Sequence, residues 1–409
     1  MQSNQDPGLN NQNTGNTPFH HVADQLLAKN ITIDNAFSAM KALVENQHAD
    51  INGKNNAGLT VLAYLANHDS KCVNIDLYIK MIEDLGANAD IKIQHSTSFL
   101  FYILRAHPPG SDEMAASLIS KNLANPFYEA GIQGFDSSTL KINKIIGFGA
   151  YSTVYACDKN LALKKVPGKD KQTNDFKGFG RKLRRFYNEV TIMHELSKND
   201  APNIIRFHGY EIEKNPLSLN IIMELVLAGS LANAFKDQKK PDWGTLLKLM
   251  SDLMTALVFL HDYYKITHND LKPHNIFLND FQQLKVGDFD LAYKGKKSGW
   301  RGTGGYLAPE VREKGNSPKA DIFSATITSA DLTRWKLVTE DYFPANLSEE
   351  EQADYYKPEE KRPPLAKDCP PGIAKIFGKG WLSDPDKRHC ARQMKEAIEL
   401  ERKNYIVVK

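Results

Sequence analysis

Hydrophobic and polar positions follow two different periods along the chain. Alternation over residues 139–146, 152–156 and 161–166 predicts half-buried antiparallel strands. From about residue 185 helical spacing dominates, and the clearest stretch ends near residue 262, with apolar residues three or four apart at Leu246, Met250, Leu253, Leu257 and Leu260. Short strands return on both sides of a turn at 279–282. The pattern predicts a small sheet-rich lobe followed by a larger helical lobe.

The first third of the chain has a different texture. Residues 1–16 are rich in Asn, Gln and Gly and contain too few apolar residues to order themselves, so they are predicted to be a disordered tail. Over residues 17–132 short helical stretches alternate with Ala-Asp or Ala-Asn turns. The helical stretches begin at Thr17-Pro18-Phe19-His20, Thr60-Val61-Leu62-Ala63 and Thr97-Ser98-Phe99-Leu100, and the turns lie at 48–52, 88–92 and 123–126.

This order resembles degenerate ankyrin repeats, which implies an all-α repeat domain that recruits a protein partner. The spacing from Thr17 to Thr60 and from Thr60 to Thr97 exceeds the usual repeat of about 33 residues. A generic helical domain therefore remains the alternative. A linker rich in Gly and Ser over 131–138 places the domain boundary before residue 139.

Composition narrows the class of protein. The 409 residues, 41% hydrophobic and 25% charged, suffice for two or three compact domains, and a net charge of +3 gives no reason to expect a nucleic-acid partner. Four widely spaced cysteines form no CxxC pair. The N-terminus lacks a signal-peptide core, and no apolar run is expected to approach the roughly 20 residues of a transmembrane segment. Together these features predict a cytoplasmic protein.

A small-residue loop between the first two strands is a candidate phosphate-binding loop. Gly147 and Gly149 let backbone amides approach a phosphate closely, with Ser152 and Val154 completing the loop. The next strand carries Lys164, and the following helix carries Glu189, which can hold the Lys164 ammonium as a clamp for phosphates.

A second group of polar residues lies in the stretch His268-Asn269-Asp270-Leu271-Lys272-Pro273-His274-Asn275 and at the end of a later strand. Asn275 and Asp288 supply the hard oxygen ligands that Mg²⁺ prefers. Asp270 is left as a carboxylate that can orient an attacking hydroxyl and accept its proton, with Lys272 close to the transferred group.

In this order and spacing, these motifs and the closing Ala308-Pro309-Glu310 resemble a eukaryotic-type serine/threonine protein kinase domain over residues 139–405. The resemblance implies an α+β bilobal fold, with an N-lobe at 139–223 and a C-lobe at 227–405, and use of ATP and Mg²⁺. It implies nucleotide contacts at Gly147, Gly149, Ser152, Val154, Ala162, Lys164, Met223, Glu224 and Val226. It also implies that Asp321 lies in a helix that supports the loop of Asp270, that Arg388 pairs with Glu310, and that Lys272 and Thr303 mark transfer to Ser or Thr.

Three positions depart from the family pattern. Asn269 replaces an Arg that pairs with a phosphorylated loop in many kinases, so activation by loop phosphorylation is not expected. Asp290 replaces the Gly after Asp288-Phe289, which could lock the loop or weaken ATP binding. Ser152 replaces a third loop Gly. Because the other motif residues are present, a constitutively competent enzyme is expected.

Two basic clusters leave the acceptor open. The first is Lys169, Lys171, Lys177, Arg181, Lys182, Arg184 and Arg185, and the second is Lys294, Lys296, Lys297 and Arg301. They are either solvated surfaces or docking sites for an anionic lipid or phosphorylated ligand. The second cluster makes a phosphoinositide kinase on the same fold one alternative to a protein kinase, and the departures at Asp290 and Asn269 make a pseudokinase scaffold the other. The combination of tail, repeats and kinase-like domain also resembles effector proteins that intracellular bacteria deliver into the host cytosol.

Overall fold

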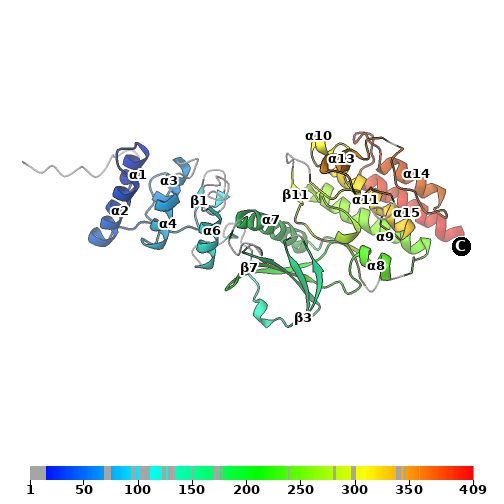
Figure 1. Ribbon diagram of the computed structural model, residues 1–409, viewed down its shortest axis with the longest axis horizontal. Helices are drawn as coiled ribbons and strands as arrows, with labels where there is room; N and C mark the ends of the chain where they lie inside the picture. Colours follow the sequence, from blue (N-terminus) through cyan, green and yellow to red (C-terminus); the bar gives the residue numbers. More distant parts are fainter. Residues whose placement is uncertain are drawn as a thin grey trace, which may run out of the picture.

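The structure is a computed structural model in which helices, sheet and a second helical body follow one another along the long axis (Figure 1). It describes residues 15–68, 75–93, 97–98, 100, 111–121, 126–127, 132, 134–149, 151–169, 176, 178–237, 239–279, 282–295, 301–337, 342–344, 346–358 and 360–408. Most of the predicted tail, the third repeat start beyond Leu100 and the turn at 123–125 lie outside these residues.

The N-terminal part is helical. It contains α1 (Pro18–Leu27), α2 (Ile33–Gln47), α3 (Val61–His68), α4 (Ile75–Glu83) and α6 (Ser111–Ser120), with the short pair β1 (Lys92–Ile93) and β2 (Thr97–Ser98). We call α1 to α6 the helical region. The helices lie side by side in a row that leads toward the sheet (Figure 1). That these helices form ankyrin repeats stays a prediction.

Successive helices of this row are joined by polar contacts. The buried His20 ring lies 2.8 Å from the Thr17 hydroxyl through Nδ1 and 3.1 Å from the Leu59 carbonyl through Nε2. One turn is joined to the next where the Asn88 backbone N–H donates to the Asn52 side-chain oxygen at 2.7 Å. The first two contacts satisfy the ring nitrogens of the buried His20, whereas the contact between the two turns is exposed.

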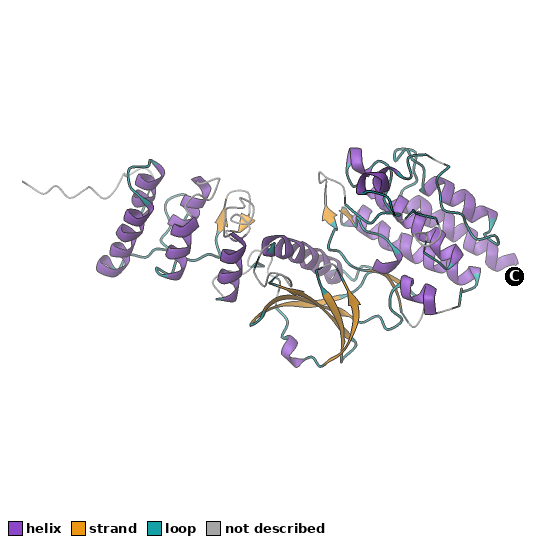
Figure 2. Ribbon diagram, viewed as in Figure 1, coloured by secondary structure: helices purple, strands orange, loops and turns teal. Residues whose placement is uncertain are grey.

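A five-stranded antiparallel sheet follows, with strand order β3-β4-β5-β7-β6 (Figure 2). Its strands are β3 (Ile142–Phe148), β4 (Thr153–Cys157), β5 (Leu161–Pro167), β6 (Phe207–Lys214) and β7 (Leu217–Glu224). The three predicted strands are confirmed, but the first starts later than expected. Residues 137–139 form a 3-10 turn instead, because the Asp136 carboxylate accepts the Ser138 backbone N–H and caps the turn.

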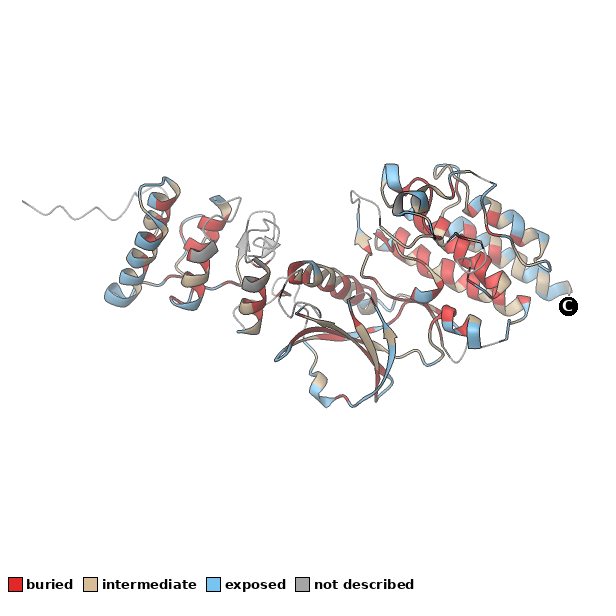
Figure 3. Ribbon diagram, viewed as in Figure 1, coloured by how far each residue is buried: buried red, intermediate tan, exposed pale blue. Residues whose placement is uncertain are grey.

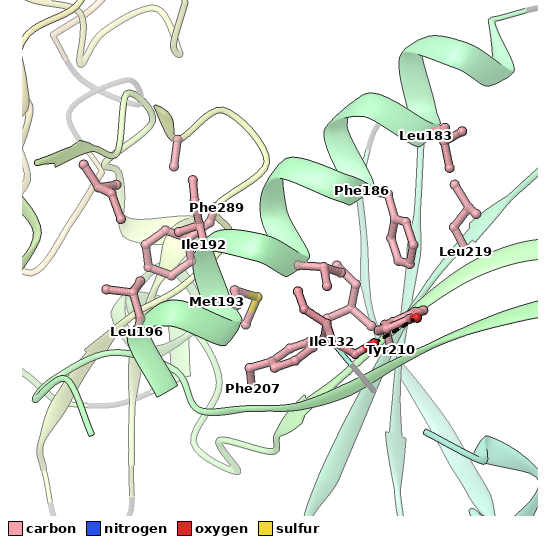
Figure 4. Close-up of a cluster of buried hydrophobic side chains, with 14 of the residues drawn as sticks. Ile132, Leu183, Phe186, Ile192, Met193, Leu196, Phe207, Tyr210, Leu219 and Phe289 are labelled. Atoms are coloured by element: carbon pink, nitrogen blue, oxygen red, sulfur yellow. Dashed lines mark hydrogen bonds between the residues drawn. The ribbon is translucent and has the colours of Figure 1, made fainter. Parts of the chain in front are cut away.

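The long helix α7 (Phe179–Lys198) packs across the sheet. Its apolar side chains Leu183, Phe186, Ile192, Met193 and Leu196 meet Tyr210 and Leu219 of the strands and Phe289 of the C-lobe (Figure 4). This continuous core fixes α7 between the two lobes, so side chains on its other face have defined positions.

The larger lobe is helical, as predicted. It contains α8 (Leu231–Asp237), α9 (Trp243–Val258), α10 (Val311–Lys314), α11 (Pro318–Arg334), α13 (Glu349–Asp354), α14 (Pro371–Gly380) and α15 (Ala391–Val408), with short strands β8 (Ile266–Thr267), β9 (Ile276–Leu278), β10 (Leu284–Val286) and β11 (Tyr293–Lys294). Buried residues gather along α9 and α11 and on the inward face of α15 (Figure 3).

Helix α9 begins where the Asp242 side chain accepts the Thr245 backbone N–H at 3.2 Å, and a π-turn extends it to Tyr263. The resulting stretch of 21 residues is long and apolar enough to cross a membrane by length and composition, so the expectation that no run approaches that length was wrong. Because 67% of its most apolar 18-residue window is buried in the protein, the apolar composition is that of a core helix.

Candidate active site

One ammonium group joins three elements at the cleft between the lobes. Lys164 Nζ on β5 lies 2.8 and 2.9 Å from the two carboxylate oxygens of Glu189 on α7. It also lies 2.8 Å from Asp288 Oδ1, which follows β10. The predicted Lys164–Glu189 pair is confirmed, and the structure adds Asp288 to it.

Burial and charge act in opposite directions on this triad. Burial alone would lower the pKa of Lys164, but the Asp288 and Glu189 carboxylates raise it above its ordinary value. Burial would raise the pKa of Asp288, yet the Lys164 ammonium holds it below its usual range. The site therefore keeps an ammonium and a carboxylate charged at neutral pH, ready for anionic and cationic groups respectively.

The loop that carries Asp270 is held from below by α11. The Asp321 carboxylate, 1% exposed, accepts the backbone N–H groups of His268 at 2.7 Å and Asn269 at 2.9 Å. It also contacts His261 Nε2 at 2.8 Å. The prediction that Asp321 lies in a helix that supports this loop is confirmed, because Asp321 lies in the first turn of α11 and its buried carboxylate fixes the loop backbone.

The Asp270 carboxylate accepts three side-chain hydrogen bonds. Lys272 Nζ donates to Oδ2 at 2.9 Å, Asn275 Nδ2 donates to Oδ2 at 2.9 Å, and the Thr303 hydroxyl donates to Oδ1 at 2.6 Å. Lys272 Nζ also donates to the Thr303 hydroxyl at 2.6 Å. The carboxylate thus has one orientation at the mouth of the cleft, where it can receive a hydroxyl proton.

The remaining predicted nucleotide residues line the same cleft, whose volume is about 2770 Å³. They are Gly147, Gly149, Ser152, Val154, Ala162, Met223, Glu224 and Val226. A Cβ at Gly149 would meet the Ser152 hydroxyl at 2.6 Å, so a larger residue at this loop position would force the Ser152 side chain to move. In the sheet, Val154 is paired with Lys164 and Ala162 with Met223. The apolar lining residues Val154 and Ala162 therefore lie on strands next to the Lys164 ammonium and to Met223.

Several apolar residues of the cleft were missed from the sequence, among them Ile146 and Phe277. Ile146 lines it from β3, just before the glycine loop, and Phe277 lines it from β9. Their positions next to Gly147 and two residues after Asn275 were the available signals. Apolar side chains such as Ile146 and Phe277 in the lining suit contact with the faces of a flat ring.

The donor set fits a magnesium ion that keeps most of its coordination for phosphates and water. The Asn275 side-chain nitrogen is used by Asp270, which leaves its amide oxygen to face a cation, and Asp288 offers a carboxylate. Across the part of the chain that the structure describes, no three His, Cys, Asp or Glu side chains form a metal-binding group. A protein usually supplies only one or two of the ligands of a Mg²⁺ ion bound with a nucleotide, so one carboxylate and one amide oxygen suffice here.

The two unusual residues have specific partners. Asn269 Nδ2 donates to the Leu291 carbonyl at 2.8 Å, and the Asp290 carboxylate lies 3.2 Å from Arg185 Nη1 on α7. Burial raises the pKa of Asp290, and the nearby Lys164 and Arg185 oppose that rise. Of the two outcomes expected for Asp290, this contact favours a fixed loop.

The basic clusters are largely used inside the fold. Lys182 donates to backbone carbonyls of Pro167 and Lys169, and Arg185 pairs with Asp290. Lys294 pairs with Glu195 at 2.6 Å. Lys171, Lys177, Lys296 and Lys297 lie outside the described residues. These contacts weaken the case for a docking surface made of the described cations.

The closing motif is anchored by a buried ion pair. Arg388 Nη1 and Nη2 lie 2.7 and 3.0 Å from the two carboxylate oxygens of Glu310, as predicted. The Arg388 side chain is 0% exposed and also donates to the carbonyls of Leu382 and Lys319.

Comparisons with known proteins agree with this geometry. The protein kinase domain family matches residues 140–398. The probable serine/threonine-protein kinase roco7 of Dictyostelium discoideum is 31% identical over 294 residues, which cover 65% of this chain and 10% of that protein. The probable serine/threonine-protein kinase drkD of the same organism is 35% identical over 199 residues, covering 47% and 15%.

A plant relative matches over more of its own length. The serine/threonine/tyrosine-protein kinase HT1 of Arabidopsis thaliana is 29% identical over 267 residues, which cover 62% of this chain and 64% of that protein. The chain therefore spans less than two thirds of each of these relatives, and the family as a whole implies use of ATP and Mg²⁺. With its five-stranded antiparallel N-lobe sheet and helical C-lobe, the chain belongs to the protein kinase family.

Proposed function

We propose that the protein transfers the γ-phosphate of Mg²⁺-bound ATP to serine or threonine hydroxyls of a protein substrate. The observation that carries this is the cluster of Asp270, Lys272 and Thr303 in the same cleft as the Lys164–Glu189–Asp288 triad. One group orients the acceptor, and the other holds the charges that meet phosphates.

Each side chain has a role that its contacts suit. Lys164, held by Glu189, would bind phosphate oxygens, and Asp288 and Asn275 would hold a magnesium ion, which would neutralise phosphate charge. Asp270 orients the acceptor hydroxyl and accepts its proton, while Lys272 stabilises charge on the transferred group. Ile146, Phe277, Val154 and Ala162 line the part of the cleft that would take the base, and the backbone of Met223, Glu224 and Val226 would bind its edge.

The helical region and the location extend the proposal. A row of helix pairs exposes side chains along its length and suits recruitment of a protein partner, as ankyrin repeats do. Cytoplasmic location is part of the same proposal and rests on the composition described above, and the host cytosol as its site rests on the resemblance to delivered effectors.

The test is transfer of labelled γ-phosphate from Mg²⁺-ATP by the purified full chain, offered generic protein substrates and phosphoinositide vesicles in parallel. Asp270→Asn keeps the shape of the side chain and is expected to lower transfer by at least about 100-fold. Asp237→Asn, which changes an exposed carboxylate at the end of α8, is the matched control and should transfer normally.

Label in protein that disappears only in Asp270→Asn supports the proposal. Label confined to lipid would establish the phosphoinositide alternative. Absence of transfer by the wild-type protein, with normal folding, would establish the scaffold alternative.

A further inference from the structure

Helix α7 presents a line of polar side chains to the residues that follow Asp288. Glu189 reaches Asp288 through Lys164, and four residues earlier Arg185 reaches Asp290. Asn188 Nδ2 donates to the Ala292 carbonyl at 2.7 Å. Residues three and four apart share one face of a helix, so a single helix face contacts this segment repeatedly.

Arg185 contacts a third element as well. Its guanidinium lies 5.3 Å from the centre of the Tyr151 ring in the glycine loop, at a distance typical of cation–π contacts. Arg185 therefore contacts both the glycine loop, through Tyr151, and the segment that follows Asp288, through Asp290. Asp290 lies two residues after Asp288, so a shift of one carboxylate displaces the other.

The opposite side of this segment is held by the loop that carries Asp270. Asn269 Nδ2 donates to the Leu291 carbonyl at 2.8 Å, and β11 pairs with β8 through Tyr293 and Lys294. Asn269 has a φ of +70°, a conformation that Asn tolerates better than most residues. Residues 288–294 are thus held from both sides by side chains and backbone of the unmodified chain.

We propose that Arg185 and Asp290 are positioning residues whose ion pair holds residues 288–294 against α7, so that the kinase is competent without a phosphate in its activation segment. The proposal rests on the kinase function proposed above. It concerns the regulation of that site. Asp290 supplies the negative charge that binds Arg185 on α7. Asn269, in place of a cation that would bind a phosphate, holds the segment by a hydrogen bond to the Leu291 carbonyl.

The ion pair is one part of this device and has a limited effect alone. The side chains of Arg185 and Asp290 are 31% and 29% exposed, so solvent screens their attraction. Loss of the pair is expected to change the rate about two- to fivefold. The coupling between the two residues, and not the size of either effect, is the decisive quantity.

The experiment uses the full chain after phosphatase treatment, with removal of phosphate verified by intact mass. The variants are Arg185→Gln, Asp290→Asn, their combination, and Arg185→Lys, which keeps the charge. Lys198→Gln, at the exposed end of the same helix, is the matched control. Two quantities are measured for each: kcat and KM for ATP, and hydrogen exchange of the backbone amides of residues 288–294 without nucleotide.

The expected result is that the dephosphorylated wild type is active, that Arg185→Gln and Asp290→Asn each lower kcat about two- to fivefold, and that the combination is no worse than either. Amide exchange at 288–294 should rise in the same three variants and stay near wild type in Arg185→Lys and Lys198→Gln.

Three results would overturn the proposal: rates and exchange equal to the control, independent effects that multiply in the double variant, or a wild type that transfers phosphate only when phosphorylated. A wild type inactive in both forms would refute the proposed function instead. In that case the exchange measurements still decide whether Arg185 and Asp290 hold the segment.

Discussion

The Thr303 hydroxyl connects the activation segment to the loop that carries Asp270. It donates to Asp270 and accepts from Lys272, so it fixes the orientation of both. Thr303→Val keeps the shape but removes both hydrogen bonds, leaving the carboxylate with an unsatisfied oxygen. We expect kcat to fall about tenfold to a hundredfold, with little change in the KM for ATP, measured by steady-state phosphate transfer.

Thr303→Ser is the matched variant because it keeps the hydroxyl. It should retain most of the activity of the wild type. Equal activity in the Val and Ser variants would show that the hydroxyl does not orient Asp270.

For single residues, the sequence predicted those ion pairs that belong to the family pattern and did not predict the other ion pairs. The Lys164–Glu189 and Glu310–Arg388 pairs were predicted and are confirmed. The Arg185–Asp290 pair joins positions 105 residues apart, and no local spacing signals such a contact. Neither partner can be assigned without knowing which face of α7 meets the loop.

At the scale of elements, the sequence predicted the first three strands of the sheet and missed the hairpin that completes it. The alternation at 152–156 predicted β4 within one residue. In β7, Leu217-Ser218-Leu219-Asn220-Ile221 also alternates apolar and polar residues, but the hairpin of β6 and β7 falls where helical spacing was expected, so this signal was missed. The residues from Leu217 to Ile222 are all buried, so the polar positions of this strand do not face solvent, as they would in a half-buried strand.

Helix α7 has no capping side chain of its own, because Gly178 stands at its start. The Asp112 carboxylate of α6 accepts the backbone N–H groups of Gly178 at 2.8 Å and Gly180 at 2.7 Å. Asp112→Ala removes this distant cap and should destabilise the start of α7 by about 1 kcal/mol. Faster amide exchange in the first turn of α7 would be the direct measurement.

Asp84→Ala, an exposed carboxylate that follows α4, is the matched control for Asp112→Ala. Unchanged exchange in the first turn of α7 with Asp112→Ala would mean that water replaces the carboxylate without loss.

Burial lowers the pKa of His20 below its ordinary value, against the opposing effects of Leu59 and Asp24. At a pH above the ordinary pKa of about 6.5, His20 is neutral in both the folded and the unfolded chain, so it does not change the free energy of unfolding. As the pH falls below that value, the unfolded chain takes up a proton that the folded chain resists, and stability falls. We expect the helical region to lose protection from amide exchange between pH 7.5 and 5.5.

His20→Gln should reduce this loss, because Gln does not titrate in that range. His68→Gln, at the exposed end of α3, is the control and should keep the pH dependence of the wild type. A loss of the same size in all three proteins would assign it to other groups.

At the scale of the whole molecule, the chain just after the helical region is docked on the kinase domain by a buried aromatic ring. Phe127, 1% exposed, has its ring centre 5.2 Å from Tyr187 of α7 in a stacked arrangement and 4.1 Å from Tyr210 of β6. Phe127→Ala leaves a cavity at this junction, and we expect it to cost about 3–5 kcal/mol. The measurement is the denaturation midpoint together with amide exchange along α7 and β6.

Phe37→Ala, in the half-buried face of α2, removes the same ring far from the junction. It should destabilise the helical region without altering exchange in α7. If both variants affect α7 equally, the region acts through its overall stability and not through the contact at Phe127.

The cap on α7 comes from a residue that lies before the start of the kinase family match at residue 140. Helix α6, which carries Asp112, is therefore a binding partner of α7 that is covalently tethered to it, one copy for each α7. A tether of this kind gives a partner an effective concentration on the order of millimolar, independent of how much protein is present. If the chain were cut between residues 121 and 178, the same contact would become a bimolecular equilibrium, and α7 would then depend on the concentration of a separate fragment.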